Sequence, residues 1–125
     1  MSDRKILIVD DEDHLRELVQ FCLEDLAGWN TLCAGSGQEA LEILQTESVQ
    51  AILLDVSMPD MDGPTVYKQI KIDEKTKDIP VIFLTAKVLP SDRSSFAKMG
   101  ISGIIFKPID PATLVIEITE ILGWA

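Results

Sequence analysis

The chain has 125 residues, 46% hydrophobic and 26% charged, which predicts one globular domain over residues 1–125 and argues against intrinsic disorder. The formal net charge of −10 opposes binding to the phosphate backbone of nucleic acids and to anionic membranes. Because no apolar run approaches the roughly 20 residues that span a bilayer, and the N-terminus lacks a signal peptide, we expect a cytoplasmic protein without nucleic-acid or membrane partners.

Short apolar runs rich in β-branched residues alternate with stretches of helical period. They predict strands at residues 5–9, 31–34, 51–54, 81–84 and 103–106. Strands that are apolar throughout, without alternation, are covered on both faces, as in a parallel sheet between two layers of helices. The sequence therefore predicts a doubly wound α/β domain with a (βα)5 order of elements.

Specific signals mark three of the helices between and after these strands. The first helix is predicted from a stripe that would face the core: Leu15, Leu18, Val19, Cys22 and Leu26. Ser36 and Glu39 have the spacing of a capping box at the start of the second helix. Asp110 followed by Pro111 predicts the N-cap and the first helical residue of the last helix.

Charged and polar groups follow four of the predicted strands. Asp10 and Asp11 follow the first strand, Asp55 the third, Thr85 the fourth and Lys107 the fifth. Parallel strands bring their carboxyl ends to one edge of the sheet, where open α/β sheets bind ligands. Crowded carboxylates raise one another's pKa unless a cation lies among them, and hard oxygen ligands suit Mg²⁺. We therefore expect a site for Mg²⁺, with Mn²⁺ as an alternative.

Each of these groups also has a purely structural interpretation. Asp10, Asp11 and Asp13 could cap the first helix and complement its dipole. Asp55 could simply start a turn, and Lys107 could be a solvated surface charge. Their joint occurrence at four strand ends favours a site for a divalent ion and a phosphate.

Four motifs carry a family resemblance: VDDE at 9–12, LLDVSMPDMDG at 53–63, FLTA at 83–86 and FKP at 106–108. Along its whole length the chain resembles the receiver domain of two-component response regulators, and in size the free-standing chemotaxis regulator. The resemblance implies a flavodoxin-like sheet with strand order 2-1-3-4-5. It also implies a single domain without an output domain.

The resemblance assigns roles to the residues at the metal site. Asp55 would be the phospho-acceptor, Asp10 and Asp11 the acidic pocket, and the backbone carbonyl of Ser57 a further metal ligand. The chemistry is sound, because a carboxylate can attack phosphorus to form an acyl phosphate. Mg²⁺ and a lysine ammonium would neutralise the charge that develops. We therefore expect a phospho-accepting signalling protein, which assists only its own phosphorylation and dephosphorylation, and not an enzyme.

Further residues would sense the phosphoryl group or control access to it. By resemblance, Thr85 is the phosphate-sensing hydroxyl and Lys107 the phosphate partner, and their movement toward the new charge would carry the signal. The small side chain of Ala86 would leave the approach to phosphorus open. Ser57 and Lys87 would flank that approach and tune the access of water.

The last strand departs from the family pattern. Receivers usually carry Tyr or Phe three residues before the strand-five lysine, and here that position is Ile104. A β-branched side chain is stiff and has no ring to swing, and Phe106 lies too close to the lysine to replace it. We therefore predict that activation reshapes mainly residues 85–90 and the start of the fourth helix. The resemblance also implies a cis Lys107–Pro108 bond.

Two surfaces are candidate docking sites. His14, Leu18 and Phe21 are spaced i, i+4 and i+7 on the first helix, next to the acidic pocket. This stripe could dock a histidine kinase or phosphotransfer domain that presents a phosphohistidine. Ile116 should be exposed on the last helix, where a downstream protein or a second copy could bind through the face formed by helix four, strand five and helix five.

Two other functions are alternatives to the receiver. A phosphatase of the haloacid dehalogenase type also uses an Asp nucleophile with Mg²⁺, but there the nucleophile follows strand one and a cap domain adds length. A receiver-like module that is never phosphorylated would bind its partners constitutively. All the expected site residues are present, which disfavours that second alternative.

Overall fold

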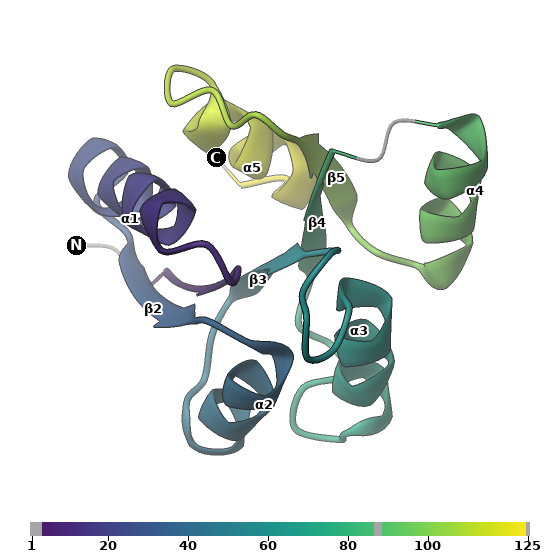
Figure 1. Cartoon of the computed structure of the whole chain (residues 1–125). Coiled ribbons are helices and arrows are strands. Elements are labelled where there is room, and N and C mark those ends of the chain that lie inside the picture. Colours follow the sequence, from purple (N-terminus) through teal and green to yellow (C-terminus); the bar gives the residue numbers. More distant parts are fainter. Residues whose placement is uncertain (1–3, 87–88, 125) are drawn as a thin grey trace.

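The computed structural model describes residues 4–86 and 89–124 (Figure 1). The elements in chain order are β1 (Lys5–Val9), α1 (Asp13–Phe21), η1 (Cys22–Leu26), β2 (Asn30–Ala34), α2 (Gly37–Thr46), β3 (Ala51–Asp55), α3 (Gly63–Ile72), β4 (Val81–Thr85), α4 (Pro90–Met99), β5 (Gly103–Phe106) and α5 (Leu114–Leu122). The strands form one parallel sheet in the order β2-β1-β3-β4-β5. The predicted fold class and strand order are therefore confirmed.

Helices cover both faces of the sheet, as the uninterrupted apolar strands predicted. Figure 1 shows α1 and α5 on one face and α2, α3 and α4 on the other. Leu53 and Leu54 are neighbours in β3, yet they enter opposite cores. Leu54 packs in the core that includes Val66 of α3, while Leu53 packs in the core that includes Val19 of α1. No helix in the described part of the chain is long and apolar enough to cross a membrane.

The strands differ from the predicted ranges by at most one residue at an end. Asp55 and Thr85 were expected just after their strands, but they are the last strand residues and pair with Leu84 and Phe106. Strand β2 begins at Asn30, one residue early. A polar side chain in the sequence suggests that the buried run has ended, but Asp55 and Thr85 are buried and their backbones still pair. These two residues are consequently fixed by the sheet itself.

The first helix does not keep its predicted stripe to the end. Val19 and Cys22 are buried as expected, but Leu26 is 60% exposed and Leu23 is buried in its place. The reason is that residues 22–26 wind as the π-helix η1. Hydrogen bonds from i to i+5 widen the turn, so each residue advances by a smaller angle than in an α-helix. The prediction for Leu26 was therefore wrong.

The predicted helix starts were confirmed in one case and wrong in another. Ser36 Oγ accepts a hydrogen bond from the Glu39 N–H (3.1 Å), as expected for an N-cap of α2. Helix α5, however, begins at Leu114 and not at Pro111. The Asp110 carboxylate instead accepts from the backbone N–H of residue 112 (2.9 Å), which closes a local turn before the helix.

An aromatic cluster lies at the amino edge of the sheet. The rings of Trp29 and Trp124 meet edge to face, with centroids 5.2 Å apart. The Arg4 guanidinium carbon lies 4.3 Å from the Trp124 ring centroid and 5.9 Å from that of Trp29. These contacts join the start of β1, the loop before β2 and the segment after α5.

Candidate functional site

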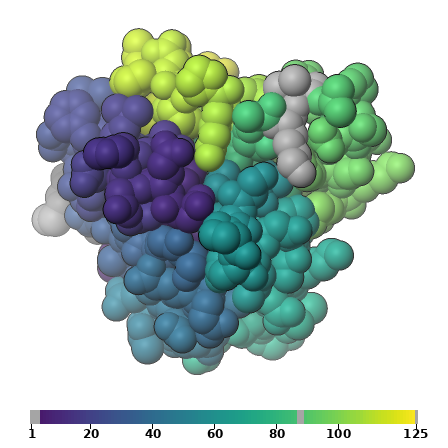
Figure 2. All heavy atoms as spheres, viewed as in Figure 1, coloured from purple at the N-terminus to yellow at the C-terminus, as the bar shows by residue number. Residues whose placement is uncertain are grey.

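The carboxyl edge of the sheet gathers the charged groups that follow or end the strands. Lys107 Nζ donates to Asp10 Oδ2 (3.1 Å) and to Asp55 Oδ1 (2.9 Å). Carboxylate oxygens of Asp10, Asp11 and Asp55 all lie within 4.8 Å of one another. Figure 2 shows the segments after β1 (purple), β3 (teal) and β5 (yellow-green) meeting on one face. The expected meeting of strand ends therefore holds for these residues.

Burial sets the electrostatics of this cluster. Asp10 is 1% exposed and Asp55 is 3% exposed. Burial raises the pKa of Asp55 above its ordinary value, the hydrogen bond from Lys107 opposes that rise, and the Asp10 charge adds to it. Burial alone would lower the pKa of Lys107, but its hydrogen bonds to Asp55 and Asp10 raise it overall. Among the described residues, Lys107 thus brings one ammonium to a group of three carboxylates.

The donor set fits a magnesium ion. Mg²⁺ takes oxygen ligands at about 2.1 Å, so two of its ligand oxygens lie at most about 4.2 Å apart. The observed limit of 4.8 Å among the three carboxylates exceeds that by an amount that small side-chain rotations can close. Asp11 is exposed, which leaves room for the waters that Mg²⁺ usually keeps. Ser57, expected to add its carbonyl, is exposed two residues after Asp55.

The loop after β3 is held by contacts that sequence reasoning missed. The Gly63 N–H donates to the Val56 carbonyl (2.8 Å). A Cβ on Gly63 would lie 2.6 Å from the Asp55 carbonyl oxygen, so no larger residue fits beside the backbone of Asp55. Asp60 accepts from the N–H groups of Gly37 (3.3 Å) and residue 38 (3.2 Å) at the start of α2. The Asp62-Gly63 pair at the start of α3 was the only sequence signal for the way in which this loop closes.

Arg16 is a second residue that the sequence did not single out. Its Nη1 donates to the Asp10 carbonyl oxygen (2.6 Å), and its Nη2 pairs with Asp13. The side chain is only 20% exposed. A cation close to four consecutive acidic residues was the only signal that could have drawn attention to it.

The remaining predicted site residues surround the cluster. Thr85 is buried, and its carbonyl accepts from the Lys107 N–H (2.9 Å). Ala86 is exposed and lines a groove of about 380 Å³ with Lys107, Leu15 and Leu18, among others. The Lys107–Pro108 peptide bond is cis, as the resemblance implied. Lys87, which was expected to flank the acceptor, lies outside the described residues.

The predicted docking residues occupy the surfaces expected of them. His14 and Phe21 are exposed, and Leu18 is half-buried in the groove beside Lys107. Ile116 on α5 is 55% exposed.

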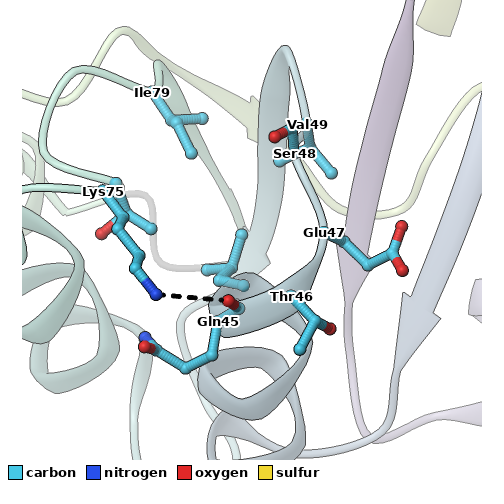
Figure 3. Close-up of a pocket in the computed structure, with 9 residues that line it drawn as sticks. Gln45, Thr46, Glu47, Ser48, Val49, Lys75 and Ile79 are labelled. Carbon is cyan, nitrogen blue, oxygen red and sulfur yellow. Dashed lines mark hydrogen bonds between the residues drawn. The ribbon is translucent and has the colours of Figure 1, made fainter.

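A hollow of about 370 Å³ lies at the opposite edge of the sheet and contains none of the predicted site residues (Figure 3). Lys75 Nζ there donates to the Gln45 carbonyl oxygen (3.5 Å), and Glu47 pairs with Lys5 (3.5 Å). Its charged groups are thus engaged in holding loops and helix ends together, and we assign no chemistry to it.

Comparison with known families identifies the chain. Residues 6–119 match the model of the response regulator receiver domain. The chain belongs to that family. Receiver domains are signalling modules of two-component systems, and they interact with histidine kinases or phosphotransfer partners.

Individual relatives differ in how much of their length this receiver covers. It is 37% identical over 120 residues to the chemotaxis protein CheY-3 of Vibrio cholerae, which covers 96% of this chain and 92% of that protein. It is 39% identical over 117 residues to a probable transcriptional regulator, ycf27, of Cyanidium caldarium, covering 94% of this chain but 45% of that protein. The receiver thus spans about half the length of its ycf27 relatives.

Solved receiver structures superpose closely on this one. CheY4 of Vibrio cholerae has a TM-score of 0.89 at 31% identity, with 96% of this chain and 99% of that chain covered. The receiver domain of the sensor histidine kinase PA1611 of Pseudomonas aeruginosa has a TM-score of 0.85 at 26% identity, with 98% and 99% covered. That structure contains a magnesium ion coordinated in its active-site cleft.

Proposed function

We propose that Asp55 accepts a phosphoryl group from a phosphohistidine on a histidine kinase or phosphotransfer protein, and that this switches the binding of a downstream partner. The observation that carries the proposal is the contact of Lys107 Nζ with both Asp55 (2.9 Å) and Asp10 (3.1 Å), next to Asp11. A carboxylate acceptor, two further carboxylates and an ammonium are the groups that aspartyl phosphorylation requires.

Each residue has a distinct task in the transfer. A carboxylate oxygen of Asp55 forms a bond to phosphorus while the histidine nitrogen leaves. Asp10, Asp11, Asp55 and the Ser57 carbonyl would hold Mg²⁺ or Mn²⁺. The metal supplies positive charge between the carboxylates and the oxygens of the phosphoryl group. Lys107 is close enough to turn from Asp55 toward a phosphoryl oxygen and neutralise it.

The signal would then arise from the new charge on Asp55. The Thr85 hydroxyl and the Lys107 ammonium are drawn toward the phosphoryl oxygens, and their loops follow. The backbone hydrogen bond from Lys107 to Thr85 (2.9 Å) couples the two loops. Ala86 would leave the approach to phosphorus open, so water could attack phosphorus and hydrolyse the aspartyl phosphate to free phosphate and the Asp55 carboxylate, with Ser57 at the side of that path.

The partners would dock on two separate faces. The groove formed by α1 and the segment after β5 is lined by Leu15 and Leu18 and lies beside Lys107. We assign this groove, together with the exposed His14 and Phe21 of α1, to the phosphodonor. The face formed by α4, β5 and α5, where Ile116 is exposed, would bind the downstream protein or a second copy.

The receiver would work in the cytoplasm. CheY-3 has little sequence beyond the region that matches this receiver. The ycf27 relatives, in contrast, continue well beyond the matched region.

Intact mass spectrometry after incubation with acetyl phosphate and Mg²⁺ tests the proposed function. We expect the mass of one phosphoryl group to be added, and the adduct to be lost on treatment with base. Asp55→Asn should show no adduct, since the nearly isosteric amide cannot form the acyl phosphate, and chelation of Mg²⁺ should abolish the adduct in the wild type.

Other outcomes would assign the protein differently. An adduct at full yield in Asp55→Asn would show that another residue is the acceptor. Absence of an adduct with every donor would favour a module that binds without phosphorylation. Turnover of many phosphate esters would indicate a phosphatase.

A further inference from the structure

Four consecutive acidic residues follow β1, and the structure gives them different surroundings. Asp10 is buried and pairs with Lys107. Glu12 is exposed, and its N–H donates to Asp10 Oδ1 (2.9 Å). Asp13 pairs with Arg16. Asp11 lies between these residues, exposed to solvent, with a carboxylate oxygen within 4.8 Å of those of Asp10 and Asp55.

The Arg16 side chain holds both ends of the segment that carries Asp11. Its Nη1 donates to the carbonyl of Asp10 (2.6 Å), and its Nη2 pairs with the carboxylate of Asp13. A guanidinium presents its donors in a planar, rigid fork, so the two contacts fix the separation of the groups that they join. The side chain is four-fifths buried, which limits its alternative conformations.

The neighbouring loop leaves room for this guanidinium. A Cβ on Gly35 would lie 3.3 Å from Arg16 Nη1 and 3.6 Å from its central carbon. The Gly35 N–H in turn donates to the Glu39 carboxylate at the start of α2. The segments after β1 and β2 are therefore packed together around Arg16.

We infer that Arg16 is a positioning residue for the metal site, and that it keeps Asp11 directed toward the metal while holding Asp13 away from it. The inference rests on the proposed function, because it assumes that Asp11 is a metal ligand. Asp11 itself is exposed, so its direction depends on the backbone on either side. Residues that orient metal ligands typically change metal affinity by about 10-fold or more when they are mutated.

Charge alone makes the opposite prediction, and this makes the test decisive. Removing a cation close to the site lowers the repulsion that Mg²⁺ meets, so by Coulomb's law the binding of Mg²⁺ should tighten. Loss of the two contacts loosens the segment around Asp11, so by our inference the binding of Mg²⁺ should weaken. The sign of the change separates the two effects.

The experiment measures the dissociation constant of Mg²⁺ from the rise in melting temperature with Mg²⁺ concentration, and independently by calorimetry. We expect Arg16→Met to weaken binding by about 10-fold. Arg16→Lys keeps the charge and should fold even if Arg16→Met does not, but a single ammonium cannot reproduce the fork, so it should also bind Mg²⁺ more weakly. Lys98→Met removes one exposed cation from α4 and should bind like the wild type.

One further variant and one spectrum complete the test. Gly35→Ala changes no charge, yet its methyl group would press on the guanidinium, so it should weaken binding by a smaller factor than Arg16→Met. In amide NMR spectra without metal, the Asp11 signal of Arg16→Lys should shift or broaden.

Unchanged or tighter binding in Arg16→Met, or wild-type binding in Arg16→Lys, would overturn the inference. A wild-type protein that does not respond to Mg²⁺ would instead contradict the metal site of the proposed function.

Discussion

The side chain of Asp55 is buried, and burial destabilises a charged carboxylate. It is 3% exposed, and it shares Lys107 with a second buried carboxylate, Asp10. Buried charges are expensive unless they are paired, and one ammonium must serve two carboxylates here. If Asp55 is the acceptor, as proposed, its function and the stability of the fold oppose each other.

Asp55→Asn should raise the melting temperature by a few degrees near neutral pH in buffer without Mg²⁺. Burial raises the pKa of Asp55 above its ordinary value, so the folded protein binds that proton more tightly than the unfolded chain does. The wild type therefore loses stability as the pH rises through the folded-state pKa of Asp55, and Asn does not. Melting curves from acid to neutral pH should show the advantage of the variant disappearing below the unfolded-state pKa.

A lower melting temperature for Asp55→Asn at neutral pH would show that the pair with Lys107 stabilises the fold by more than the burial costs. Raising the Mg²⁺ concentration is the control. Mg²⁺ should stabilise the wild type more than the variant, because the variant lacks one of the three carboxylates.

The sequence could locate the proposed acceptor, Asp55, but not the residues that hold its surroundings in place. Asp55, Thr85 and Lys107 stand at strand ends, and strand ends are a local pattern that topology brings to one edge. Arg16 and Gly63 act through contacts with backbone atoms of other segments, which depend on how the loops close. No local pattern records such contacts.

Ile104 in β5, where receivers usually carry Tyr or Phe, lies close to a contact between β5 and α4. Ile104 packs against the core under α2, α3 and α4, and Phe106, two residues on, lies on the same side of the strand. The Arg93 guanidinium carbon of α4 lies 4.6 Å from the Phe106 ring centroid. Because Phe106 precedes Lys107, a movement of the lysine can reach α4 through this ring.

Activation with beryllofluoride should therefore change the NMR signals of the first turns of α4, with little rotamer change at Ile104. Arg93→Met should reduce the changes in α4. The free energies of unfolding of Arg93→Met, Phe106→Leu and the double variant should reveal a coupling of about 0.5–1 kcal/mol, the usual range for an exposed cation–π contact. Large changes confined to Ile104 and Phe106, with α4 silent, would contradict this prediction.

Strands were easier to predict than the details of helices. Apolar runs identified every strand to within one residue at each end, because burial on both faces leaves a continuous signal. The π-helix after Phe21 and the delayed start of α5 at Leu114 were missed. Both depend on which of several backbone hydrogen-bond spacings of similar energy is formed, and the period of the hydrophobic residues does not distinguish these spacings.

The proposed phosphorylation site and the aromatic cluster lie at opposite edges of the sheet. Asp10, Asp55 and Lys107 lie at the carboxyl edge, whereas Trp29 and Trp124 lie at the amino edge with Arg4. A strand of five residues separates the edges by roughly 16 Å.

Tryptophan fluorescence should report unfolding and remain insensitive to Mg²⁺. The chain has two tryptophans, and both belong to the cluster at the amino edge. Urea should change the emission strongly as the two rings separate from each other and become solvated. Titration with Mg²⁺ should leave the emission of the folded protein unchanged, while circular dichroism melts recorded on the same samples show stabilisation. Quenching of the folded protein by Mg²⁺ would show that the two edges are coupled.

The placement of Lys107 between Asp10 and Asp55 has a further consequence. The counter-ion of these carboxylates, the Lys107 ammonium, is covalently attached to the chain, so its local concentration does not change on dilution. Two buried carboxylates are thereby partly neutralised by a side chain of the protein itself. In the proposed transfer, the Lys107 ammonium would turn from Asp55 toward the phosphoryl group by rotating about its side-chain bonds. The cation that neutralises these carboxylates is therefore part of the protein and remains at the site whichever group it pairs with.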